Sequence, residues 1–224
     1  MSTSEILFEE YMIGRARIYG ELAMLASKPL RLDRVRFFCE SMTLFLEAVE
    51  DETDKEKLKF SIAEMDAWLK ENDGREDEQE FRNERAREFT YLFRFGDDRI
   101  TDNASAALSK KKLMKRKEWE DCKRFYREHG FKLCENVKKL EDSFEVQALF
   151  MEHLINMTLF TEEEMVDELL RAQVTFLDDH ILKWINVLSA GLSSFAKEGS
   201  IYRAIAPLFT VICKTDCECI KELV

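Results

Sequence analysis

Proline and glycine are scarce in this chain, and their scarcity limits the folds that it can adopt. Only two prolines and seven glycines occur among 224 residues. Because these residues terminate helices and form hairpin turns, their rarity favours long helices over many short strands. The expected fold class is therefore all-α, with one domain over residues 1–224 and a bundle of about nine to ten helices.

The chain also lacks a long apolar run and an export signal. Its first residues, MSTSEILFEEYM, hold no basic region followed by an apolar stretch, and no run of about eighteen apolar residues follows. We therefore expect a cytoplasmic protein without stable membrane insertion. Six scattered cysteines in a chain of this size indicate reduced thiols and no disulfide framework.

The net charge and the absence of catalytic motifs exclude several classes of function. The net charge of −11 opposes binding to nucleic acid and favours a cationic partner, such as a peptide that carries arginines. No HExxH motif and no glycine-rich phosphate loop is present, and ion pairs between neighbouring helical turns account for the many carboxylates. We expect a protein that is not an enzyme and that has no cofactor.

Apolar residues recur at helical spacing, most clearly at Leu58, Ile62, Met65 and Leu69. Thr161, followed by three glutamates, is typical of an N-cap. The periodicity predicts helices over residues 4–27, 35–45, 58–69, 79–94, 116–129, 146–157, 162–177, 177–188 and 200–213.

Residues 95–117 lose this periodicity and are predicted to form a long loop. Loops of this length inside compact domains are often functional. The loop carries Lys110, Lys111, Lys112, Lys115, Arg116 and Lys117. Such a run is suited to weak contact with the phosphate of a nucleotide or of molybdopterin, although a solvated loop is the commoner interpretation.

Several short motifs, in their order along the chain, resemble those of the TorD, DmsD and NarJ family of redox-enzyme maturation chaperones. They are RARIY at 15–19 with Leu22, Ala23 and Pro29, EFTYLF at 88–93, and Phe176, Leu177, His180, Trp184, Tyr202 and Phe209 near the end. The chain resembles a divergent member. Glu141, Asp142 and Ser143 stand where the family often has proline, aspartate and histidine, and Ala107 replaces an aromatic residue.

The resemblance implies an all-helical chaperone that binds the twin-arginine signal peptide of a molybdopterin-containing oxidoreductase, its apo form, or both. Such a chaperone holds its client until the cofactor is inserted and export can proceed. The implied site joins an apolar groove to an acidic edge, with Asp142 facing solvent to pair with arginine. Its residues are Phe89, Leu92, Phe93, Phe95, Asp142 and Ser143.

Other interpretations remain open at this point. The aromatic residues are also consistent with core packing, and Asp142 with a cap on its own helix. A helical interaction or regulatory protein without a redox client would fit if its own side chains filled the groove. Cys213, Cys217 and Cys219 allow a metal site, although their spacing is not that of a paired CxxC motif. A monomer and a domain-swapped dimer are both possible.

Overall fold

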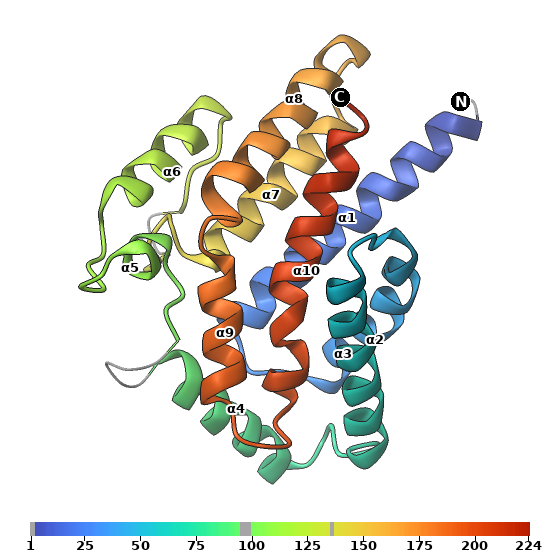
Figure 1. Cartoon of the computed structure of the whole chain (residues 1–224), viewed down its shortest axis with the longest axis vertical. Helices are drawn as coiled ribbons and strands as arrows, with labels where there is room; N and C mark the ends of the chain where they lie inside the picture. The colour runs from blue at the N-terminus through green and yellow to red at the C-terminus, as the bar shows by residue number, and fades with distance from the viewer. Residues whose placement is uncertain (1–2, 95–99, 135–136) are drawn as a thin grey trace. The chain divides into compact units, whose positions relative to one another are not determined.

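The computed structural model describes residues 3–94, 100–134 and 137–224 (Figure 1). Within these ranges the chain forms ten α-helices and no β-strand, so the predicted all-α fold class is confirmed. The backbone divides into two compact units, and each unit combines segments that are distant in sequence. The expectation of a single domain stays a prediction.

Unit 1 comprises Met1–Ala26, Asp102–Trp184 and Asp216–Val224. Helices α7 and α8 lie side by side in it (Figure 1). Buried side chains occur all around α7, from Phe144 to Thr158, which places this helix at the centre of the unit. The helices are α1 (Thr3–Ser27), α5 (Ala104–Leu108), α6 (Lys117–Glu128), α7 (Phe144–Leu159), α8 (Glu163–Phe176) and the last turn of α10 (Ile201–Lys221).

Unit 2 comprises Ser27–Thr101 and Ile185–Thr215. Helices α2 and α3 pack side by side in it (Figure 1). Asp51 caps α3 by accepting a hydrogen bond from the Asp54 backbone N–H, which satisfies one of the free donors of the first turn. The helices are α2 (Leu32–Phe45), a 3₁₀ turn (Leu46–Ala48), α3 (Glu52–Glu71), α4 (Gln79–Phe93), α9 (Ile185–Phe195) and most of α10.

Two predicted boundaries are wrong. Glu162, one residue after the predicted Thr161, is the N-cap of α8, and it makes no side-chain capping hydrogen bond. The helix predicted over 177–188 is interrupted, because Leu177–Ile181 forms a π-helical turn, η2, before α9 begins at Ile185. In this turn the Leu182 N–H donates to the Leu177 carbonyl oxygen at 2.8 Å. Apolar periodicity over a single turn does not separate the π pattern from the α pattern.

The predicted loop over 95–117 contains a helix that periodicity missed. Residues 104–108 form α5, whose five residues are too few to establish a helical repeat. Residues 95–99 lie outside the described part of the chain, and residues 109–116 connect α5 to α6 without regular structure. Among the described residues, no helix is both long enough and apolar enough to cross a bilayer.

Candidate functional site

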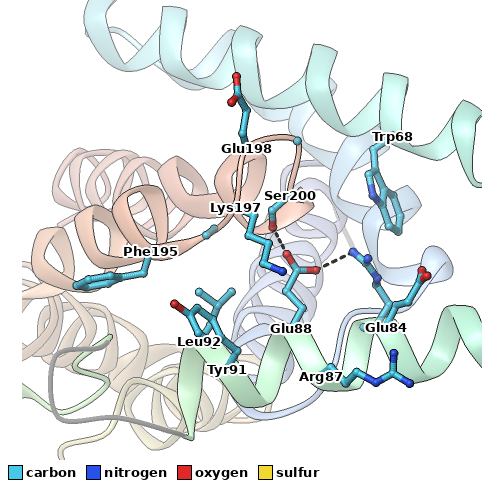
Figure 2. A pocket seen from close by; sticks show the side chains of 13 residues that line it. Trp68, Glu84, Arg87, Glu88, Tyr91, Leu92, Phe195, Lys197, Glu198 and Ser200 are labelled. Atoms are coloured by element: carbon cyan, nitrogen blue, oxygen red, sulfur yellow. Dashed lines mark hydrogen bonds and ion pairs between the residues drawn. The ribbon is translucent and has the colours of Figure 1, made fainter.

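A cavity of about 620 Å³ lies in unit 2 beside α4 (Figure 2). Three segments build its walls: α3, α4, and the turn that joins α9 to α10. Cavities of roughly 300–1,000 Å³ are the usual size for binding a small ligand or a few side chains. The lining residues are Trp68, Glu84, Arg85, Arg87, Glu88, Tyr91, Leu92, Phe195, Ala196, Lys197, Glu198, Gly199 and Ser200.

The walls of this cavity combine apolar surface with charged side chains of both signs, three carboxylates and three basic groups. Trp68, Leu92 and Phe195 supply the apolar part, and Phe195 leaves 41% of its surface exposed. Glu198 is exposed, whereas Glu88 points into the cavity (Figure 2). A ligand that is both apolar and cationic finds complementary groups on these walls.

The Glu88 carboxylate already holds a guanidinium group of the protein itself. Its Oε2 pairs with Arg85 Nη1 at 2.8 Å, and its Oε1 accepts a hydrogen bond from the Ser200 hydroxyl. The Arg85 guanidinium also lies over the Trp68 ring, 5.7 Å from its centroid. The cavity wall thus brings a carboxylate and an aromatic face to one arginine, the combination that favours guanidinium binding.

The turn over 198–200 also borders a second cavity in unit 2. That cavity measures about 350 Å³ and reaches Phe60 on α3, a side chain that is 56% exposed. Gly199 has a φ of 73°, which side-chain-bearing residues rarely adopt, so the turn requires glycine there. The two cavities together give unit 2 a surface on which a short peptide segment can lie across this turn.

The predicted apolar residues of α4 occupy different surroundings. Leu92 lines the larger cavity. Phe89 is only 5% exposed and stacks on Phe93 at a centroid distance of 4.9 Å, and the Phe93 ring in turn contacts Tyr202 at 6.1 Å. These two rings therefore pack within unit 2, and neither is part of the cavity lining. Phe95 lies outside the described residues.

Asp142 and Ser143 belong to unit 1, where both are buried. The expectation that Asp142 faces solvent is wrong, since its exposed fraction is 0%. It does not cap its own helix either, because Ser143 is the N-cap residue of α7. Instead, Asp142 Oδ2 accepts a hydrogen bond from the Ser105 backbone N–H at 2.8 Å and so caps α5.

A backbone pairing explains why Asp142 is buried. Asn103 and Ser143 form an isolated antiparallel bridge. On either side of it, the Ala104 N–H donates to the Asp142 carbonyl oxygen and the Phe144 N–H donates to the Asp102 carbonyl oxygen, both at 2.9 Å. This pairing joins segments that are about forty residues apart, and sequence periodicity does not report pairings of that range.

Three buried polar atoms lie on residues of this junction. Asp142 Oδ1, Ser105 Oγ and Ser143 Oγ have no hydrogen-bond partner among the described residues. Buried polar groups in native proteins are nearly always paired with protein, water or ligand. The junction can therefore accept a polar ligand group or water.

The opening motif RARIY has a structural role. Arg15 Nε pairs with Asp216 Oδ1 at 2.6 Å, its Nη2 donates to Gln173 Oε1 at 2.8 Å, and both charged side chains are 4% exposed. The Tyr19 hydroxyl donates to the same carboxylate. These contacts join α1, α8 and the end of α10 within unit 1.

The C-terminal cysteines belong to different parts of the fold. Cys213 lies in unit 2, whereas Cys217 and Cys219 lie in unit 1. Burial and the neighbouring Asp178 carboxylate raise the pKa of the Cys217 thiol to about 12. Across the ranges that the structure covers, no three histidine, cysteine or acidic side chains form a group suited to a metal ion, and all six cysteines are free thiols.

Sequence reasoning missed Trp68 and the turn over 195–200 as parts of a site. Trp68 lies one residue before Leu69 of the predicted helix, and Ser200 is only the first residue of the helix predicted over 200–213. The EFTYLF motif was the signal that pointed to this wall, through the predicted Leu92 and through Glu88, which was not predicted as a site residue.

Comparison with known proteins identifies relatives of nearly full length. A family model described as nitrate reductase delta subunit matches residues 51–190. Chaperone protein TorD of Vibrio cholerae serotype O1, El Tor Inaba strain, is 26% identical over 211 residues, which cover 93% of each chain. The TorD protein of the Classical Ogawa strain is 26% identical over 212 residues, 94% of this chain and 93% of the relative.

No solved structure matches the chain. The family match takes in more than half of the sequence, and the relatives that accompany it are chaperones, not enzymes. The family match and the chaperone relatives agree with the short sequence motifs described above and with the all-helical fold. The chain belongs to the TorD and NarJ family of redox-enzyme maturation chaperones, the family that the nitrate reductase delta subunit model describes.

Proposed function

We propose that this protein is a cytoplasmic chaperone that binds the twin-arginine signal peptide or the apo form of a molybdopterin-containing oxidoreductase. It holds the client until the cofactor is inserted and export can proceed. The observation that carries this proposal is the cavity beside α4, because it presents aromatic and carboxylate groups together in a member of a chaperone family. The protein acts by binding and is not an enzyme.

A twin-arginine leader matches the chemistry of this cavity. Such a leader has cationic and apolar portions, so its receptor needs an apolar surface next to carboxylates. Phe195 and Trp68, which lie in the wall with the fully buried Leu92, receive the apolar side chains, and the exposed Glu198 receives the first guanidinium. The arrangement of Arg85 between Glu88 and the Trp68 ring is the pattern that a leader arginine would adopt.

Asp142 enters this proposal as a second contact that depends on α5. Its carboxylate is buried and bonded to the Ser105 N–H, so a leader arginine reaches it only when α5 moves away. The guanidinium would then replace the Ser105 N–H and also supply a donor to the unpaired Oδ1. Leader binding at Asp142 is therefore coupled to opening of this segment.

Calorimetric titration of the full chain with synthetic twin-arginine leaders from molybdoenzymes of the same genome tests the proposal. We expect dissociation constants of about 1 μM, weakened about tenfold or more when both leader arginines become lysine. Glu198→Gln should weaken binding, whereas Glu222→Gln, on an exposed residue outside the cavity, should not. Asp142→Asn separates the two contacts, because it affects only the second.

Each outcome of this titration has a definite meaning. Weakening by Glu198→Gln alone supports the cavity as the whole leader site, and weakening by both variants supports two separate contacts, one in each unit. Failure of every leader to bind, with the circular dichroism spectrum of the protein intact, would exclude signal-peptide binding and leave the apo form of the client as the ligand.

A further inference from the structure

The connection between α5 and α6 exposes a short segment of unusual composition. All eight residues from 110 to 117 are exposed, and six of them are lysine or arginine. The other two are Leu113 and Met114, whose exposed fractions are 39% and 59%. We call residues 110–117 the basic loop; it joins α5 to α6 at the left edge of Figure 1.

The backbone of the basic loop is left-handed at two lysines. Lys112 has a φ of 49° and Lys115 a φ of 55°, in a region that residues with a side chain seldom occupy, apart from asparagine, aspartate and histidine. These two residues lie on either side of Leu113 and Met114. The chain therefore changes direction before and after the apolar pair, and the pair stays exposed between cationic neighbours.

We propose that the basic loop attaches the protein reversibly to an anionic membrane surface. The ammonium and guanidinium groups would contact lipid headgroup phosphates, while the Leu113 and Met114 side chains enter the boundary between headgroups and acyl chains. The exposed apolar pair favours a membrane over a nucleic acid or a free phosphate, because those ligands offer no apolar phase for the two side chains.

The acidic character of the whole chain slows approach to an anionic surface, but it does not decide the contact itself. Screening confines electrostatic interactions to about 10 Å at an ionic strength of 0.1 M, so the charge of the loop itself dominates at a surface that it touches. Glu118 and Glu120 follow at the start of α6, and Asp121 pairs with Arg124 at 2.8 Å. Even with these glutamates beside it, the segment remains strongly cationic.

The base of the loop is held in place by α6. The Trp119 Nε1–H donates to Glu141 Oε2, and Lys115 and Lys123 lie over the Trp119 ring at 5.8 and 4.2 Å. One loop with two apolar side chains gives marginal, reversible attachment, which differs from insertion. The proposal therefore agrees with the expectation of no stable membrane insertion, and it is independent of the leader site.

Flotation of the full chain with lipid vesicles tests this inference. Vesicles of phosphatidylcholine and phosphatidylglycerol in equal parts should carry the protein upward, and pure phosphatidylcholine vesicles should not. The double variant Lys110→Gln, Lys111→Gln should lower the partition coefficient about 25-fold, at roughly fivefold per cation. The matched double variant Lys132→Gln, Lys138→Gln, on exposed lysines elsewhere in unit 1, should leave it unchanged.

The apolar pair has its own matched control. Leu113→Gln with Met114→Gln should also weaken vesicle binding, whereas Met165→Gln with Leu223→Gln, on similarly exposed residues, should not. An apolar double variant that binds as well as the wild type would overturn the inference and indicate a purely electrostatic polyanion contact. Release by inorganic pyrophosphate at constant ionic strength would overturn it in favour of a soluble phosphate ligand. The absence of binding to the anionic vesicles would reject it outright.

Discussion

Arg15 and Asp216 form an ion pair that is almost completely removed from solvent. Both side chains are 4% exposed, and Tyr19 and Gln173 complete their hydrogen bonds. Because neither charge has access to water, each one depends on the other for its stabilisation. The contacts of Asp216 with Arg15 and Tyr19 thus join two segments from opposite ends of the sequence.

We expect Asp216→Ala to lower the free energy of unfolding by about 3–5 kcal/mol, because it leaves the Arg15 guanidinium buried without its counter-charge. Asp178→Ala is the control, since Asp178 pairs with Lys221 at 2.8 Å where both side chains are nearly half exposed. Its loss should stay within about 1 kcal/mol. Urea denaturation measures both values, and equal losses would show that the buried pair has no special role.

His180 gives the stability of unit 1 a defined pH dependence. Burial among neighbours that include Phe125 and Phe176 lowers its pKa from the usual 6.5. The folded state therefore binds the proton more weakly than the unfolded state. The stabilisation that depends on the neutral ring is complete above pH 6.5 and is lost as the pH falls from 6.5 through the lower folded pKa.

His180→Phe keeps an aromatic ring at this position and removes the titration. Below pH 6.5, the unfolding free energy of the wild type should fall relative to that of the variant, by at most about 1.4 kcal/mol per pH unit. Between pH 7 and 8 the difference should be constant. Thermal or urea unfolding across this range is the measurement, and parallel curves below pH 6.5 would contradict the assigned pKa direction.

Helix α5 depends on another segment for its existence. Five residues are too few for a helix to be stable alone. The Asp142 carboxylate and backbone carbonyl accept hydrogen bonds from two N–H groups of its first turn, those of Ser105 and Ala104. The short helix is therefore ordered by contact with the start of α7.

Asp142→Ala should accelerate amide hydrogen exchange at Ser105 by about tenfold, since a lost N-cap destabilises a helix by about 1–2 kcal/mol. Ser143→Ala is the matched control, because Ser143 is the N-cap residue of α7 but makes no side-chain capping bond. Its exchange pattern should match the wild type. If both variants behaved alike, Asp142 would not be the residue that orders α5.

The net charge of −11 acts on the molecule as a whole and should speed encounter with cationic leaders. Raising the ionic strength from about 0.01 to 0.15 M shortens the Debye length from about 30 to 8 Å, so the association rate should fall about tenfold. A leader whose arginines are replaced by glutamine should lose most of this salt dependence. Stopped-flow mixing measures the association rate and the dissociation rate separately. A salt effect on the dissociation rate alone would contradict electrostatic steering.

Local sequence patterns were sufficient for the helices that present a repeated apolar face. The predicted helices around Met65 and Phe150 are present, because spacing over several turns determines which face is buried. The same signal failed for α5, which is little more than one helical turn, and for η2, where a single turn departs from the α-helical pattern. The family was predicted correctly, because several short motifs occur along this chain in the same order as in the family.

By itself, therefore, the sequence determined the fold class, most of the helices and the family, because composition and periodicity depend on neighbours along the chain. Only the tertiary structure decided which residues share a site. Trp68, Glu88 and Ser200 meet at one cavity, and Asp142 is buried under α5, through contacts between segments that are distant in sequence. Burial and pairing across such distances depend on how helices pack, and no local pattern carries that information.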